Sequence, residues 1–163
     1  MWPVLSYSIS FVIFLVAATY DIAWRRIPNA VPFCLVGIGL VNHLIDHRLE
    51  IATVYAMAVF ILCLIAWTFQ VLGGGDVKLL AAAAFAIPCN DVGSLVLVIA
   101  LSGGGLSLCY IVLSRVLPAV SPVRPRTYFR RVLRTEQRRI VRRLSLPYGV
   151  AIALGSIITM TVG

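Results

Sequence analysis

The sequence predicts an all-α, polytopic membrane protein with six transmembrane helices and one amphipathic cytoplasmic helix between spans 5 and 6. Its composition is 61% hydrophobic and only 12% charged, whereas soluble domains average about 45–50% apolar and about 25% charged residues. Charged residues divide the chain into six uncharged stretches, five of which are 19 to 25 residues long. About 20 apolar helical residues cross a ~30 Å hydrocarbon layer with their backbone groups satisfied internally, so each long stretch is a candidate span.

The predicted spans form a single membrane-embedded domain over residues 1–163. The first stretch has no basic residue before its apolar run, so we expect it to remain as a helix rather than to be cleaved as a signal peptide. The fourth stretch, residues 79–90, has only 12 residues and by length suits a re-entrant segment as well as a short span. The approximate spans are 3–20, 28–45, 51–72, 76–90, 92–115 and 146–162, with a cytoplasmic Arg-rich segment at 116–145.

The distribution of basic residues predicts the orientation of these spans. Lys and Arg collect in cytoplasmic loops. With six spans and both termini outside, 13 of the 14 basic residues lie in cytoplasmic segments and only Arg48 lies outside. If the fourth stretch did not cross, the Arg-rich segment would face the side opposite Arg25 and Arg26. A short fourth span is therefore the better interpretation.

The Arg-rich segment has the pattern of an amphipathic helix. At 100° per residue, one side carries Phe129, Val132, Leu133, Ile140 and Leu144, and the other carries Arg131, Arg134, Arg138 and Arg142. We expect this helix to lie on the anionic lipids of the inner leaflet. A docking surface for an acidic partner is an alternative. Nucleic-acid binding is not expected, because aromatic and basic residues are not interleaved as a single-strand platform requires.

Two of the six acidic residues are the candidates for chemistry. Asp21 ends the first span and Asp76 begins the fourth, so both lie on the cytoplasmic side although they are 55 residues apart. An ionisable group at membrane depth costs ~2.5–3.5 kcal/mol and calls for an explanation. Taken singly, Asp21 would pair with Arg25 one turn on, and Asp76 would cap a helix. The other four map to hydrated positions: Asp46, Glu50, Asp91 and Glu136.

As a pair, the two aspartates suggest peptide-bond hydrolysis without a metal. Two neighbouring carboxylates cannot readily both ionise, so the ionised member acts as a general base on a water while the protonated member polarises a carbonyl. The glycines before Asp76, Gly73, Gly74 and Gly75, allow unusual backbone dihedrals and close approach of an extended substrate. A flexible turn or tight helix packing is the alternative for the glycines.

Three motifs together resemble those of the type IV prepilin peptidases, which belong to the GxGD class of intramembrane aspartic proteases. They are Asp21 with Arg26-Ile27-Pro28-Asn29, then Gly73-Gly74-Gly75-Asp76-Val77-Lys78, then Pro147-Tyr148-Gly149 at the last span. The resemblance implies cleavage of the basic leader from prepilins at the cytoplasmic face of the bacterial inner membrane, with Asp21 and Asp76 as the catalytic pair.

The resemblance also implies a subclass. Bifunctional members of the family carry an N-terminal extension with a cysteine-rich loop and N-methylate the mature pilin. Here the first span starts near Met1 and the four cysteines form no CxxC motif. We expect the short, peptidase-only branch that serves tight-adherence (Flp) pili, without methyltransferase activity.

The remaining motif residues can have a structural role instead of a functional one. Lys78 either pairs with a carboxylate, including a substrate acid, or anchors the span by the charge rule. We expect Arg26, Pro28 and Asn29 to shape the loop after Asp21, and Tyr148 and Gly149 to shape the start of the last span.

Other classes of site are disfavoured. His43 and His47 are spaced i, i+4 but map to the external end of the second span without an HExxH motif, so neither a metal site nor another cofactor is expected. No GxSxG elbow or phosphate-binding loop occurs. A small ion-coupled transporter with Asp21 and Asp76 as proton or cation sites is the main alternative to the protease. A non-catalytic assembly factor is a third.

Overall fold

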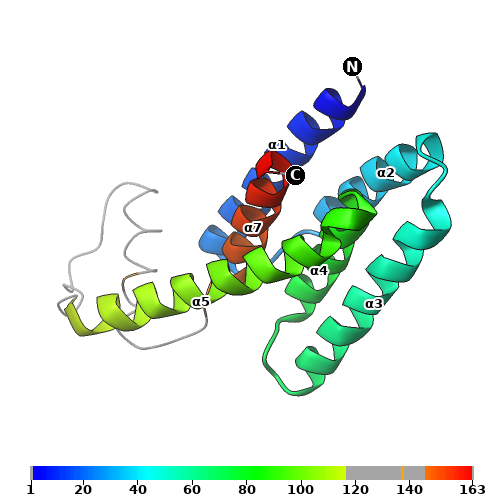
Figure 1. Ribbon diagram of the computed structural model, residues 1–163. Coiled ribbons are helices and arrows are strands. Elements are labelled where there is room, and N and C mark those ends of the chain that lie inside the picture. Colours follow the sequence, from blue (N-terminus) through cyan, green and yellow to red (C-terminus); the bar gives the residue numbers. More distant parts are fainter. Residues whose placement is uncertain (1, 117–136, 138–145, 163) are drawn as a thin grey trace.

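Every regular element that the structure describes is helical, which confirms the all-α prediction for these residues. The structure is a computed structural model that describes residues 2–116, 137 and 146–162 (Figure 1). Its elements are α1 (Trp2–Trp24), α2 (Ala30–Ile45), α3 (Leu49–Thr68), α4 (Gly74–Ala86), the 3-10 helix η1 (Cys89–Asp91), α5 (Val92–Val116) and α7 (Tyr148–Val162). The predicted amphipathic helix within 116–145 lies outside the described residues, except for Val116 and Gln137.

α4 is the central helix of the bundle. It packs against α2, α3 and α7, and Ala82, Ala83 and Ala84 are each at most 3% exposed. Alanine and glycine allow helix backbones to approach closely in a membrane. On the facing helix, a Cβ placed on Gly39 would lie 2.5 Å from the carbonyl oxygen of Phe85. The alanine run of α4 therefore forms part of the core.

The outer helices expose apolar side chains rather than polar ones. Val54 and Leu62 of α3 are 68% and 65% exposed, and Leu97 and Leu101 of α5 are 61% and 67% exposed. A helix that is apolar all round needs an apolar environment on its outer face. Three helical segments are long and apolar enough to cross a membrane, and α2 and α7 are shorter apolar helices. The chain is therefore a membrane protein, while the number of spans stays a prediction.

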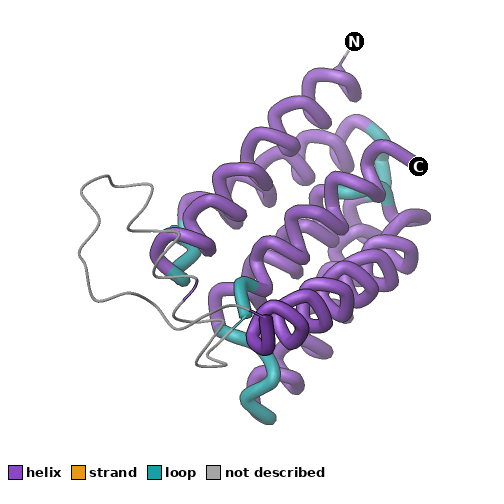
Figure 2. Tube along the Cα trace, turned by 90° about the vertical axis from the view of Figure 1, so that its left-hand side faces the viewer, coloured by secondary structure: helices purple, strands orange, loops and turns teal. Residues whose placement is uncertain are grey.

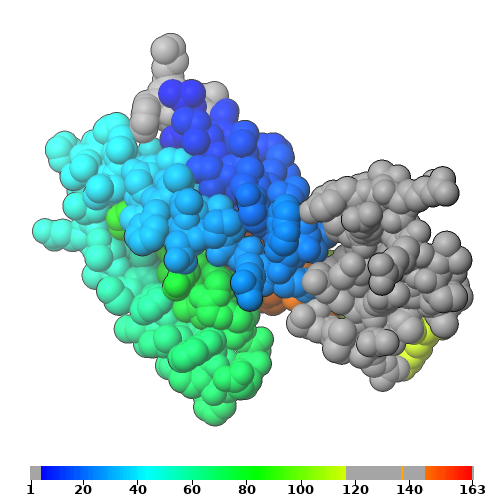
Figure 3. All heavy atoms as spheres, turned by 180° about the vertical axis from the view of Figure 1, so that it is seen from behind, coloured from blue at the N-terminus to red at the C-terminus, as the bar shows by residue number. Residues whose placement is uncertain are grey.

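The helices run between two opposite ends of the bundle. The last turn of α1 lies against the start of α7, so these helices are antiparallel and both termini lie at one end (Figure 2). At that same end, a cavity of about 120 Å³ is lined by Tyr7 of α1, Asp46 after α2 and Pro88 after α4. α4 therefore runs from the end that holds Asp76 to the end that holds the termini. From behind, α1 and α2 lie side by side over one face (Figure 3).

Candidate active site

Asp21 lies in the last turn of α1, where the chain reverses direction. Arg25 follows the helix with a left-handed backbone (φ 53°), and its N–H donates to the carbonyl oxygen of Asp21 at 3.0 Å. This closes the helix and sends the chain toward α2. The carboxyl side chain of Asp21 is only 6% exposed. A buried carboxylate requires hydrogen-bond partners, and one of them comes from the far end of the sequence.

Gly149, in the first turn of α7, supplies that partner. Its backbone N–H donates to Oδ2 of Asp21 at 2.9 Å, in a buried contact between residues 128 positions apart. The first N–H groups of a helix have no partner within the helix and carry a partial positive charge, so they suit an anion. A Cβ on Gly149 would lie 2.9 Å from Oδ2 and 3.0 Å from Cβ of Asp21. The glycine is therefore needed for this contact.

Asp76 is the third residue of α4 and not the capping residue that its sequence position also suggested. The cap is Gly73, with extended backbone (φ −78°, ψ 148°). The backbone of Gly73 hydrogen-bonds the Asp76 carboxylate, as in the return half of a capping box. The side chain of Asp76 is partly buried at the end of α4. Asp76 thus lies at the positive end of α4, just as Asp21 lies against the positive end of α7.

The packing of α1, α4 and α7 brings the two aspartates together. Asp21 and Arg25 are the charged groups that act electrostatically on Asp76. Tyr148 lies against α5, where a Cβ on Gly103 would be 2.8 Å from its ring, and its phenol lies within electrostatic range of Asp76. Two carboxylates, a cation and a phenol thus meet at one end of the bundle, an arrangement that can bind a water and move protons.

A comparison with known families identifies the family of the chain. Residues 8–112, well over half of the chain, match the type IV leader peptidase family. The chain belongs to this family. It is therefore a peptidase, and the family implies a prepilin-type substrate. Searches of curated proteins and of solved structures each gave no match.

The glycines before Asp76 in this leader peptidase do not adopt the unusual dihedrals that the sequence allowed. No described glycine has a positive φ, and Gly74 and Gly75 belong to the first turn of α4. A Cβ on Gly75 would lie 3.7 Å from Cβ of Ile27, and one on Gly74 would lie 3.7 Å from the indole nitrogen of Trp67. Both distances are ordinary van der Waals contacts, so the start of α4 packs against the loop after α1 and against α3 without requiring a glycine at either position.

A polar contact joins the loop after α1 to α4. Nζ of Lys78 donates to Oδ1 of Asn29 at 3.3 Å. Pro28 accepts from the N–H of Val31 at the start of α2, and Arg26 is exposed. Lys78 follows Asp76 by two residues, which places the two side chains about 200° apart around the helix. Lys78 therefore lies on the opposite face of α4 from the aspartates.

The two histidines do not converge. His43 is 3% exposed, and its Nε2 is 2.9 Å from the carbonyl oxygen of Phe85, which ties α2 to the end of α4. His47 follows α2 with φ 53° and is exposed. Among the described residues, no three metal-ligating side chains form a group. His43 is therefore a packing residue of the core.

We predict that the two aspartate positions crosslink. In a variant whose native cysteines are replaced by alanine, a short bifunctional thiol reagent should join Asp21→Cys to Asp76→Cys, because the two carboxylates lie within electrostatic range of each other. The measurement is a shift in gel mobility after proteolysis between the two helices. The pair Asp46→Cys and Asp76→Cys is the matched control, since Asp46 lies at the other end of the bundle. Equal yields for both pairs would contradict a shared site.

Proposed function

We propose that the protein is an intramembrane aspartic endopeptidase that removes the N-terminal leader from Flp-type prepilins at the cytoplasmic face of the bacterial inner membrane. Asp21 and Asp76 are its catalytic pair. The observation that carries the proposal is the convergence of these two carboxylates between α1, α4 and α7 in a chain of the leader peptidase family.

The proposed reaction needs only the two carboxylates and a water. The ionised carboxylate takes a proton from the water, and the resulting hydroxide attacks the scissile carbonyl carbon. The protonated carboxylate donates a hydrogen bond to the carbonyl oxygen as negative charge develops there. The proton held by the base then passes to the leaving nitrogen, the C–N bond breaks, and an acid and an amine are released. The Gly149 N–H orients one of the carboxylates throughout.

The proposed membrane topology has six spans, with both termini outside. α4 has 13 residues, about 20 Å at 1.5 Å per residue, which is short for a ~30 Å hydrocarbon layer. Its two ends nevertheless reach opposite ends of the bundle, which supports a crossing. The aspartate end also carries Arg25, Arg26 and Lys78, as the positive-inside rule requires of a cytoplasmic end.

The proposed subclass is the peptidase-only, Flp-type branch. Cys34 and Cys109 are exposed and Cys63 and Cys89 are buried, and all four are free thiols. They lie apart in apolar segments and form no cysteine-rich loop within this sequence. We propose in addition that the Arg-rich segment contacts anionic lipids of the inner leaflet, because its basic and apolar residues separate at helical spacing.

The proposal is tested by cleavage of a Flp-type prepilin in membranes that contain the protein. We expect the prepilin to lose its leader, which mass spectrometry and N-terminal sequencing of the product would measure. Membranes from cells without the protein are the control. Cleavage should persist in the presence of EDTA, because carboxylates activate the water directly. A loss of cleavage with EDTA that added zinc restores would contradict the aspartic mechanism.

A further inference from the structure

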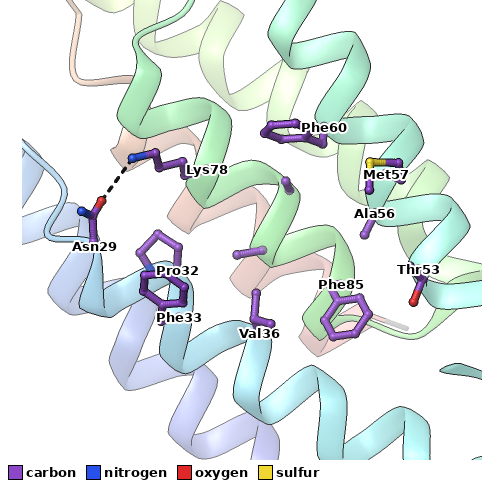
Figure 4. A pocket seen from close by; sticks show the side chains of 12 residues that line it. Asn29, Pro32, Phe33, Val36, Thr53, Ala56, Met57, Phe60, Lys78 and Phe85 are labelled. Atoms are coloured by element: carbon purple, nitrogen blue, oxygen red, sulfur yellow. Dashed lines mark hydrogen bonds between the residues drawn. The ribbon is translucent and has the colours of Figure 1, made fainter.

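A second concave site lies on the far side of α4 from the aspartates. It is a groove of about 480 Å³ between α2, α3 and α4. All but three of its lining residues are apolar, with Pro32, Phe33 and Val36 on one wall and Met57 and Phe60 on the other (Figure 4). Phe33 is 74% and Met57 53% exposed. The groove therefore opens to the surroundings of the bundle, which in a membrane are lipid.

One end of the groove is cationic. Lys78 and Asn29 line it together, and their hydrogen bond of 3.3 Å crosses the groove end (Figure 4). Within the described part of the chain, no carboxylate pairs with Lys78. Because Asn29 accepts through Oδ1, its amide N–H groups remain as donors, as do further N–H groups of the ammonium. The third polar lining residue, Thr53, donates to the carbonyl oxygen of Leu49 at 2.8 Å. The polar end therefore offers donors and a positive charge, which suit an anion.

The groove is much shorter than the hydrocarbon layer. Along α4 it extends from Lys78 to Phe85, seven residues or about 10 Å. One leaflet contributes about 15 Å of a ~30 Å hydrocarbon layer. A transmembrane helix of a partner would need contact over the whole layer, whereas an acyl chain that starts at the interface needs only one leaflet.

The position of the groove also separates it from the catalytic pair. Lys78 lies about 200° around α4 from Asp76, and Lys78 is not among the charges that act on Asp76. A peptide chain in this groove would have α4 between it and both aspartates. The occupant is therefore not the scissile segment of a substrate.

We propose that this groove binds one anionic phospholipid. An acyl chain packs between α2 and α3 along the alanine face of α4, and the headgroup phosphate accepts hydrogen bonds from the Lys78 ammonium and the Asn29 amide. The site is specific for the negative charge of the headgroup, since the apolar walls are the same for any acyl chain. It requires only that the protein lies in a membrane and is independent of the proposed protease chemistry.

The test uses the full chain in nanodiscs of phosphatidylcholine that contain a small fraction of phosphatidylglycerol with a photoactivatable acyl chain. Peptide mapping by mass spectrometry should locate the label on α2, α3 and α4 along the groove. Lys78→Gln should lower that labelling about fivefold, the effect of one basic residue near an anionic surface. Arg48→Gln, at the opposite end of α2, is the matched control and should leave labelling unchanged.

A second pair of variants tests the groove itself. Ala56→Trp fills the groove and should reduce labelling, whereas Ala58→Trp, which is exposed on the same helix outside the lining, should not. Equal labelling by photoactivatable phosphatidylcholine and phosphatidylglycerol would overturn the proposal, as would labelling that neither Lys78→Gln nor Ala56→Trp reduces. Displacement of the label by a synthetic prepilin-type peptide would also overturn it and assign the groove to the substrate. None of these readouts depends on cleavage, so failure here leaves the proposed protease untouched.

Discussion

Asp21→Asn and Asp76→Asn should each lower the rate of prepilin cleavage about 10²–10⁴-fold, the range for loss of a general acid or base. Asparagine keeps the size of the side chain and can still accept the Gly149 N–H bond at position 21. It can neither take a proton from water nor share one with its neighbour. Because the two carboxylates act as a unit, we expect the double variant to be no less active than either single variant. The measurement is initial cleavage rate in membranes with equal amounts of protein.

Asp46→Asn is the matched control for these variants. Asp46 follows α2 at the end of the bundle opposite the catalytic pair and is exposed, so the same chemical change there should leave the rate unaltered. Cleavage that survives in both Asp21→Asn and Asp76→Asn would reject the carboxylate pair. It would favour the transporter alternative, in which the two aspartates are proton or cation sites.

Gly149→Ala should lower cleavage about 10²-fold without unfolding the protein. The added Cβ would lie 2.9 Å from Oδ2 of Asp21 and 3.0 Å from its Cβ and Cγ. Asp21 must therefore shift and lose the N–H bond of 2.9 Å that orients it, and a displacement of about 1 Å at a catalytic group costs on that order. Alanine is a better helix former than glycine, so a defect would not come from helix propensity.

The control for this prediction is Gly104→Ala in α5, where a Cβ would meet nothing within 4 Å. It should retain full activity. The two variants should be compared by cleavage rate and by thermal unfolding in detergent. A Gly149→Ala protein as active as the Gly104→Ala protein would show that the contact with Asp21 does not position the carboxylate for catalysis.

Several features of the site were predictable because they depend on short stretches of sequence. Long uncharged stretches predict apolar helices, and two acids at the ends of such helices stand out by their cost in a membrane. The alanine run predicts close packing, and Ala82 to Ala84 are buried in the core. Membership of the leader peptidase family, indicated by three motifs in order, is confirmed by the family match.

Other assignments could be made only from the way in which the helices pack. Asp76 was interpretable as a cap, but Gly73 is the cap and Asp76 is the third residue of α4. The sequence places His43 at the external end of the second span, and only the structure shows that its Nε2 lies 2.9 Å from the carbonyl oxygen of Phe85 in the core. In the sequence, Gly149 stands out only as the small residue of the motif Pro147-Tyr148-Gly149. The motif does not reveal which carboxylate the backbone of Gly149 contacts.

The sequence alone predicted a helical membrane protein with two candidate carboxylates, since hydropathy and charge act over neighbouring residues. The resemblance of three short motifs indicated the leader peptidase family. Tertiary structure decided which groups meet. The hydrogen bond from Gly149 to Asp21 joins residues 128 positions apart. The face of α4 that each side chain occupies decides that Asp76 lies on the side of Asp21 while Lys78 faces a separate groove. Such contacts depend on how whole helices pack, because local periodicity sets the faces of a helix but not the neighbour of each face.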